Sequence, residues 1–383
     1  MRLSRILILA VSLCGFTAAQ AAADPFKQRA PLQKAVADKR RITSPAGIDV
    51  LEVVEVAGMK YAVRIRGQDK ANPILLYLHG GPGTPMIPFA HVFEDPWEQY
   101  FTVVQWDQRG AGKSAPLNDA KAVAATMSMD VMTQDVIDMT NYLRQRFGKD
   151  KIFLLGHSWG SILGVRVVKA HPELFNAYIG TGQVTNARRS EAIGYQHTLT
   201  LAKKQGLTEA VKELEAIAPY PKPGTDLEEG GLEVRHKWNA YFGESVFGFK
   251  SLEDAMFKFA LSSPDYSNED LKRLMSGTGT VYKPLDMPIA DFDAFSMGAQ
   301  WQIPVFFIEG RFDWQANHQL ALEYFRFICA PHKEFYHIEE AAHASMAEQP
   351  EQFAEILIKR VRPIADGREG TETVKATRES ASP

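Results

Sequence analysis

A serine occupies the centre of the segment Gly156–Gly160, which reads Gly-His-Ser-Trp-Gly. The apolar run Ile152–Leu155 precedes this segment and a helix-like run over 161–170 follows it, so the pattern predicts a strand, a tight turn and a helix with Ser158 at the apex. Small flanking residues permit the strained backbone of such a turn, and the hydroxyl then stands clear of the sheet. The position suits a nucleophile, although a glycine- and serine-rich turn without chemistry has the same pattern.

A serine hydroxyl is a weak nucleophile at neutral pH, so it needs a base to accept its proton and an acid to orient that base. Asp313 follows the strand-like run Ile303–Ile308, and His343 follows the next such run, Glu334–Ile338. Each lies in a loop behind a strand, in the chain order serine, acid, histidine. Because the carboxyl ends of parallel strands meet at one edge of a sheet, Ser158, Asp313 and His343 are predicted to form a catalytic triad.

A glycine-rich turn supplies the donors that an oxyanion would need. The buried-strand pattern Ile74–Leu78 runs directly into His79–Gly83, which reads His-Gly-Gly-Pro-Gly. Glycines there let the backbone turn its N–H groups into a pocket, and the expected pair of donors is the N–H of Gly81 and the N–H of Trp159. A Gly-Pro turn with no chemical role is the alternative interpretation.

Four segments together resemble a known family: His79–Gly83, Trp106–Ser114, Gly156–Gly160 and Gly310–Asp313. They are similar to the α/β-hydrolase superfamily, in the branch that contains the proline iminopeptidases, over about residues 50 to 360. The resemblance implies a serine peptidase-type fold that releases an N-terminal proline or hydrolyses related amides and esters, with no metal or organic cofactor. It also implies the triad named above, and structural roles for Asp107 and Arg109 beside the serine turn.

The chain departs from this family in two places. The residue before the histidine is often glycine, and here it is Ala342. In such enzymes, acidic residues of an inserted cap bind the substrate amine near a Trp-Glu pair, whereas this chain has Trp238-Asn239. Substitutes for the missing carboxylate are Glu233, Glu244 and Glu309, so the weaker substrate-binding candidates are Trp238, Tyr241, Glu244 and Glu309.

Three functions remain open at this stage. The first is an aminopeptidase that prefers N-terminal proline, the second a carboxylesterase or lactonase with the same triad, and the third a non-catalytic binding protein of the same fold. The expected partner is a small peptide or ester. A net charge of −3 gives no electrostatic case for nucleic acid, and the ten histidines show no metal-ligand spacing, so no metal site is predicted.

Strand patterns alternate with helical ones along most of the chain, which predicts an α/β-hydrolase fold with a mostly parallel, doubly covered sheet. The alternation stops at about Val184 and resumes after Gly298. We therefore expect a core over 24–183 and 299–362, a helical cap over 184–298 and a disordered tail over 363–383. Residues 24–47 are expected to form an irregular leader.

Residues 1–23 read as a signal peptide, with Arg2 and Arg5 ahead of the apolar stretch Ile6–Phe16 and small residues at a cleavage site. Export to the periplasm or the medium is therefore expected. The apolar stretch is too short for a membrane span. Lipid attachment at Cys14 is a minor alternative. Without Cys14, Cys329 cannot form an intrachain disulfide, and we expect it to be buried.

Overall fold

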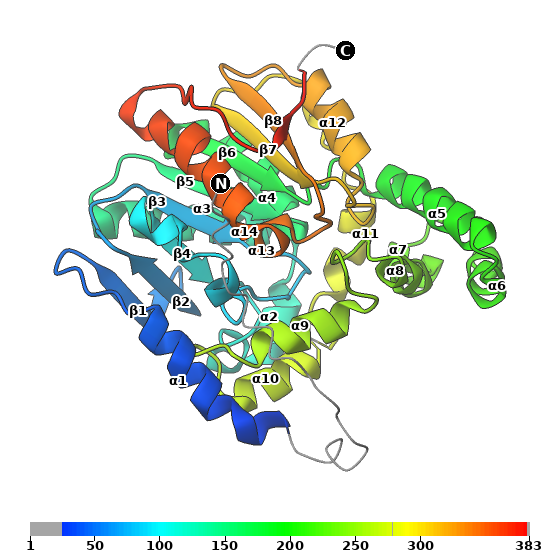
Figure 1. Ribbon diagram of the computed structural model, residues 1–383, viewed down its shortest axis with the longest axis horizontal. Helices are drawn as coiled ribbons and strands as arrows, with labels where there is room; N and C mark the ends of the chain where they lie inside the picture. Colours follow the sequence, from blue (N-terminus) through cyan, green and yellow to red (C-terminus); the bar gives the residue numbers. More distant parts are fainter. Residues whose placement is uncertain (1–24, 278, 381–383) are drawn as a thin grey trace, which may run out of the picture.

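The computed structural model describes residues 25–277 and 279–380, and its centre is a nine-stranded sheet (Figure 1). Along the sheet the strands follow the order β1-β2-β4-β3-β5-β6-β7-β8-β9. The six strands from β4 to β8 run parallel, while β1, β2 and β9 pair in antiparallel fashion with their neighbours. The predicted fold class is thus confirmed. The strands are β1 Ile48–Val56, β2 Met59–Gly67, β3 Ile74–Leu78, β4 Thr102–Trp106, β5 Ile152–His157, β6 Phe175–Thr181, β7 Val305–Gly310, β8 Lys333–Ile338 and β9 Thr377–Arg378.

Both faces of the sheet are covered by apolar side chains. The strand β3 shows why, because all five of its residues are buried and they alternate between two separate clusters. Leu76 and Leu78 join the cluster that includes side chains of α3 and α4, whereas Leu75 and Tyr77 join the cluster on the opposite face. The core helices are α2 Ala120–Thr126, α3 Met129–Phe147, α4 Trp159–Ala170, α12 His318–Phe327, α13 Ser345–Glu348 and α14 Pro350–Ile356.

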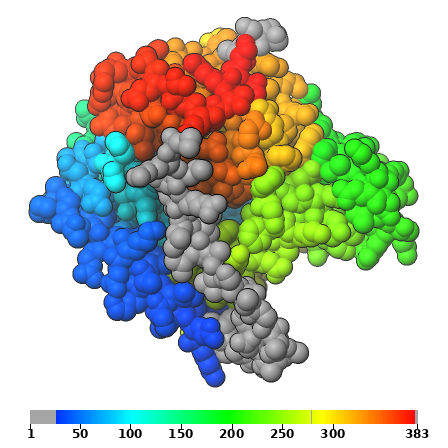
Figure 2. Space-filling view, viewed as in Figure 1, coloured from blue at the N-terminus to red at the C-terminus, as the bar shows by residue number. Residues whose placement is uncertain are grey.

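The cap segment, residues 184–298, joins β6 to β7, and its described residues contain helices and turns but no strand of the sheet. Three of its aromatic residues, Tyr195, Tyr220 and Trp238, form a small apolar cluster of their own. The segment makes up the green to yellow-green side of the molecule in Figure 2. Its helices are α5 Ala187–Lys204, α6 Thr208–Ala216, α7 Leu227–Gly230, α8 Leu232–Tyr241, α9 Leu252–Ala260, α10 Asn268–Met275 and α11 Asp286–Ala290.

The expectation of an irregular leader over residues 24–47 is wrong, because Arg29–Lys39 form the helix α1 beside α10 (Figure 1). Its first residue explains the order. The buried Arg29 guanidinium donates to the carbonyl oxygens of Leu261 and Tyr266 in the cap segment, at 2.9 Å each. Just past the other end of α1, Arg40 forms an ion pair of 2.5 Å with Glu98 of the core. These contacts are polar, so the spacing of apolar residues in the segment does not indicate the helix.

The expected disordered tail is also not what the structure shows for residues 363–380. A 3-10 helix spans Arg362–Asp366, and β9 pairs with β8 in antiparallel fashion. Beyond β9, the Glu379 carboxylate contacts Nδ1 of His337 at 2.7 Å. Strand pairing and the contact between the Glu379 carboxylate and the His337 imidazole therefore order a segment whose polar composition favours disorder.

Cys329 is exposed, which corrects the expectation of a buried thiol. Its backbone explains why it nonetheless has a fixed position: its N–H donates to Ala299 and its carbonyl oxygen accepts from the N–H of Trp301. The predicted signal peptide and Cys14 lie outside the described residues. Among the residues that are described, the helices are all too short or too polar to cross a membrane.

Candidate active site

Ser158 lies between β5 and α4, at the apex of a turn with positive φ (φ 54°, ψ −123°). Two neighbouring positions leave no room for a side chain. A Cβ atom on Gly156 would lie 2.7 Å from the carbonyl oxygen of Gly160, and one on Gly160 would lie 2.0 Å from the carbonyl oxygen of Leu78. The close packing of β3, β5 and α4 therefore requires glycine on both sides of the serine and forces its backbone into a strained conformation.

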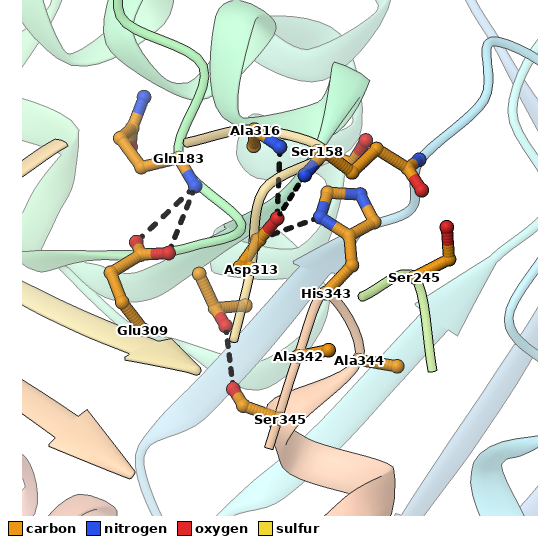
Figure 3. Close-up of polar contacts among 12 residues, drawn as sticks. Ser158, Gln183, Ser245, Glu309, Asp313, Ala316, Ala342, His343, Ala344 and Ser345 are labelled. Atoms are coloured by element: carbon orange, nitrogen blue, oxygen red, sulfur yellow. Dashed lines mark hydrogen bonds and ion pairs between the residues drawn. The ribbon is translucent and has the colours of Figure 1, made fainter. Parts of the chain in front are cut away.

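His343 and Asp313 meet in the loops that follow β8 and β7 (Figure 3). Nδ1 of His343 lies 2.8 Å from Oδ2 of Asp313, and Oδ1 of Asp313 accepts the backbone N–H groups of Gln315 and Ala316 at 2.9 and 2.8 Å. Burial would raise the pKa of Asp313, but His343 and the N–H of Ala316 outweigh it and hold that pKa below its ordinary value. A carboxylate in this position fixes the tautomer with Nε2 free to accept a proton.

Nε2 of His343 is buried and has no hydrogen-bond partner among the described residues. It lines the same cavity as the Ser158 side chain, which is partly exposed to that cavity. Gly182, with φ of +52°, packs against the imidazole so closely that a Cβ atom there would lie 2.7 Å from Cε1 of His343. The ring is thus held by Asp313 on one side and by bare backbone on another.

The loop that carries His343 is held by a half-buried carboxylate. Glu348 accepts the backbone N–H groups of Ala342 and Ala344, at 2.6 and 2.8 Å, on either side of the histidine. The same carboxylate accepts the N–H of Phe247 in the cap segment at 3.0 Å. Burial raises the pKa of Glu348. Glu348 therefore links the histidine loop to the cap, a role that no side-chain motif in the sequence signals.

The glycine turn after β3 packs beside Ser158, where a Cβ atom on Gly80 would lie 3.0 Å from Cβ of Ser158. Gly81 has φ of +113° and lines the cavity together with Ser158. Trp159 is the first residue of α4, where backbone N–H groups have no partner within the helix. The two predicted donors therefore flank the serine, in an arrangement that could stabilise negative charge on a substrate oxygen.

His79 and Gln108 tie the glycine turn to the segment Trp106–Ser114. The N–H of Gln108 donates to Nε2 of His79 at 3.0 Å, and the Gln108 side-chain amide donates to the His79 carbonyl oxygen at 3.0 Å. Burial lowers the pKa of His79 to about 4, so the ring is neutral at pH 7 and can accept. The indole N–H of Trp159 donates to the Gln108 side-chain oxygen at 3.2 Å.

Asp107 and Arg109 make internal contacts and do not line the cavity at Ser158. The Arg109 guanidinium donates both Nε–H and Nη2–H to Asp135 at 2.7 Å. Asp107 accepts the backbone N–H of Lys113 at 2.7 Å and the hydroxyl of Tyr266 from the cap segment. These contacts fit the structural roles that the family resemblance implies.

A cavity of about 310 Å³ opens on Ser158 and His343 between the core and the cap segment. Its polar lining includes Glu228 of α7, His236 of α8 and Gln315. The pKa of Glu228 is raised by burial and by the nearby carboxylates of Asp286 and Asp226. Glu228 stands in the sequence as one of two adjacent glutamates, which looks like an ordinary surface pair, and so it was missed.

A second carboxylate lies close to the site but is already neutralised. Glu191 of α5 lines a smaller cavity of about 120 Å³ that also contacts Ser158 and His343. It forms an ion pair of 2.9 Å with Arg235 and accepts the hydroxyl of Tyr220 at 2.8 Å. Burial would raise the pKa of Glu191, but Arg235 and His236 hold it below its ordinary value.

The structure does not bring the four weaker candidates to the cavity at Ser158. Trp238 and Tyr241 stack edge-to-face within the cap, with ring centroids 5.3 Å apart, and Trp238 donates to Glu213 at 2.8 Å. Glu244 is buried and contacts Nε2 of His197 at 2.6 Å. Glu309 is buried in β7, where it accepts the N–H of Gln183 (Figure 3). None of the four is among the residues that line the cavity.

The described residues contain no group of three or more His, Cys, Asp or Glu side chains placed to hold a metal ion. The chemistry that the arrangement itself can perform is acyl transfer, because a strained serine, an imidazole oriented by Asp313 and the two residues predicted as backbone donors line one small cavity.

Residues 73–350 match the family model described as the alpha/beta hydrolase fold. The chain is also similar to a Bacillus subtilis protein named "Probable aminopeptidase YbaC", with 30% identity over 332 residues, which cover 84% of this chain and 99% of that protein. A "Probable proline iminopeptidase" of Streptomyces coelicolor is 34% identical over 127 residues, which cover 33% of this chain and 38% of the relative.

Solved structures give the same picture at the level of the fold. A proline iminopeptidase-related protein from Thermus thermophilus superposes with a TM-score of 0.56 at 21% identity, covering 83% of this chain and 98% of that one. Proline iminopeptidase from Mycobacterium smegmatis gives a TM-score of 0.57 at 18% identity, covering 81% and 96% of the two chains.

Proposed function

The chain belongs to the α/β-hydrolase family, and from that premise we propose that it is a serine aminopeptidase that releases the N-terminal residue of short peptides through an acyl-enzyme. One observation carries the proposal. Ser158, His343 and Glu228 line a single cavity, and Asp313 holds the imidazole from outside it. A nucleophile, its base and a carboxylate for a substrate amine thus share one space.

In the proposed reaction, Nε2 of His343 accepts the Ser158 proton as Oγ attacks the scissile carbonyl carbon. Asp313 keeps the proton on Nδ1 and stabilises the imidazolium that forms. The tetrahedral intermediate places its oxyanion against the N–H groups of Gly81 and Trp159. One such donor contributes about 3 kcal/mol to lowering the barrier. His343 then protonates the leaving amine, and water repeats the cycle on the ester.

Glu228 is proposed to bind the free amine of the substrate. It lines the cavity with Ser158, and its carboxylate neighbours provide negative charge, whereas Glu191 is already paired with Arg235. An ammonium group beside Glu228 would offset the burial and the repulsion that raise the pKa of this carboxyl. This assignment replaces the carboxylates that the sequence suggested, which lie elsewhere.

Hydrolysis of carboxylic esters by the same triad is the second candidate, because most of the cavity lining is apolar and would accept an uncharged acyl group. The two functions differ in their need for the amine. An aminoacyl anilide and its N-acetylated form, compared with a short-chain aryl ester, distinguish them. We expect acetylation to reduce kcat/KM at least tenfold, and an equal rate on both anilides would overturn amine recognition.

The Glu228→Gln variant tests the residue itself, with Glu229→Gln on the same short helix as the matched control, because both carboxylates are exposed and only Glu228 lines the cavity. We expect Glu228→Gln to raise KM for the free-amine anilide and to leave aryl-ester hydrolysis unchanged. A fluorophosphonate probe should label the wild type and not Ser158→Ala. Absence of labelling in the wild type would instead favour a non-catalytic binding protein.

We further propose that the enzyme is exported. The support is the sequence of residues 1–23, with two arginines, an apolar stretch and small residues at a cleavage site. N-terminal sequencing of the protein recovered from the periplasm or the medium should begin at or near residue 24. Recovery of the full-length chain in the cytosol would contradict export.

A further inference from the structure

The cavity at Ser158 has a large apolar side that catalysis does not use. We define the apolar lobe as the set of side chains on that side that come from the loop after the glycine turn and from the cap helix α9: Met86, Phe89, Leu252, Ala255, Met256 and Phe259. The four α9 residues recur at steps of three and four, so one face of this helix covers the cavity.

A second apolar cavity of about 230 Å³ lies directly beyond the lobe. Phe89 and Met256 line both cavities and therefore form the wall between them. Met256 is only partly buried and its side chain is unbranched, so this wall can give way to a longer group. The space available next to Ser158 is thus about 310 Å³, with more behind a movable side chain.

The position of Glu228 decides which part of the substrate enters the lobe. In an aminoacyl substrate, the amine and the side chain are attached to the same carbon atom, next to the scissile carbonyl. If Glu228 binds the amine, the side chain on that carbon lies in the same cavity, most of whose remaining lining is apolar. The apolar lobe then faces the side chain of the N-terminal residue.

We propose that this enzyme prefers an N-terminal residue with a large apolar side chain, such as leucine, methionine or phenylalanine, over proline. The inference rests on the proposed aminopeptidase function and specifies its substrate. The three methylene groups of proline close back on the amine, so they reach less far from the α-carbon than the open side chains of leucine, methionine and phenylalanine. Since each buried methylene strengthens transition-state binding several-fold, we expect leucyl substrates to exceed alanyl ones in kcat/KM by roughly tenfold or more.

The test compares p-nitroanilides of alanine, proline, leucine, methionine and phenylalanine on the wild type and on Ala255→Phe, which fills the lobe. Ala255→Phe should lose at least tenfold in kcat/KM on the three large residues and change by less than about threefold on alanine. Lys258→Ala, on the exposed side of the same helix, is the matched control and should match the wild type. Wild-type preference for proline or alanine would overturn the proposal, and so would an equal loss on all substrates in a folded Ala255→Phe variant.

A second variant covers the case in which Ala255→Phe does not fold. Met256→Ala removes part of the wall and joins the two cavities. Among anilides of norvaline, norleucine and 2-aminooctanoate, the ratio of kcat/KM for the longest side chain to kcat/KM for the shortest should therefore rise at least fivefold over the wild type. An unchanged ratio would refute the lobe as the side-chain site. These outcomes are separate from the aminopeptidase proposal, which depends on the effect of N-acetylation.

Discussion

Removal of the Glu348 carboxylate should damage both stability and catalysis. This side chain accepts the N–H groups of Ala342 and Ala344 around His343, and the N–H of Phe247 from the cap. In Glu348→Ala, the first two donors remain partly buried without a partner, at a cost of about 1–3 kcal/mol each. The third donor is exposed to water and adds little. The expected loss in the free energy of unfolding is therefore about 2–6 kcal/mol.

The catalytic effect follows from the position of the histidine. Its loop would lose two of the contacts that fix it, and a displacement of about 1 Å at a reacting group lowers the rate by roughly 100-fold. Urea denaturation followed by fluorescence gives the stability, and anilide hydrolysis gives kcat. Glu348→Gln, which keeps one oxygen acceptor, should fall between wild type and alanine in both measurements.

Glu351→Ala serves as the control, because Glu351 is an exposed carboxylate in the first turn of α14. It should change the free energy of unfolding by less than about 0.5 kcal/mol. The reasoning is refuted if Glu348→Ala unfolds at the same urea concentration as Glu351→Ala and retains its kcat. Loss of stability with full activity would show that the histidine loop does not depend on this carboxylate.

Three further perturbations test other parts of the structure. Asp313→Asn should lower kcat by roughly 10⁴-fold without unfolding the protein, as steady-state kinetics and circular dichroism would show, because the amide no longer selects the His343 tautomer. Gly160→Ala should destabilise by about 3 kcal/mol in urea, since its Cβ would lie 2.0 Å from the Leu78 carbonyl oxygen; unchanged stability would contradict this close approach. Burial would raise the pKa of Glu334, but its basic and hydroxyl partners lower it to about 2. The carboxylate therefore stabilises the fold above pH 4.5, and that contribution disappears as the pH falls from about 4.5 to 2. Glu334→Gln should therefore lose about 3 kcal/mol at pH 7 and show a flatter acid denaturation curve, and an unchanged curve would refute the assignment.

The central strands could be predicted from the sequence because each is a short apolar run buried on both faces. The prediction for β3 matches the structure residue for residue. The glycines around Ser158 were informative for a related reason. Close backbone packing leaves no room for a side chain at these positions, so the requirement is visible in the sequence as glycine on both sides of the serine.

Other features left no such pattern. Glu348 acts on backbone N–H groups, which every residue but proline carries, so its spacing from His343 conveys nothing. The apolar face of α9 has the same periodicity whether it packs on a core or covers a cavity. Glu228 is an exposed carboxylate like its neighbour Glu229, and only the fold shows that it lines the cavity at Ser158. In each case the role of the residue depends on which distant segment it contacts, and the sequence alone does not show that contact.

The helix α1 has a mechanical consequence for any movement of the cap. Its N-terminal end is fastened to the cap by Arg29, and the residue after its C-terminal end, Arg40, is fastened to the core through Glu98. The helix therefore acts as a tether of fixed length across the two parts, and opening the cap near α9 and α10 requires the Arg29 contacts to break. A chain shortened to begin at residue 41 would keep every residue placed at the active site and lose this connection between cap and core.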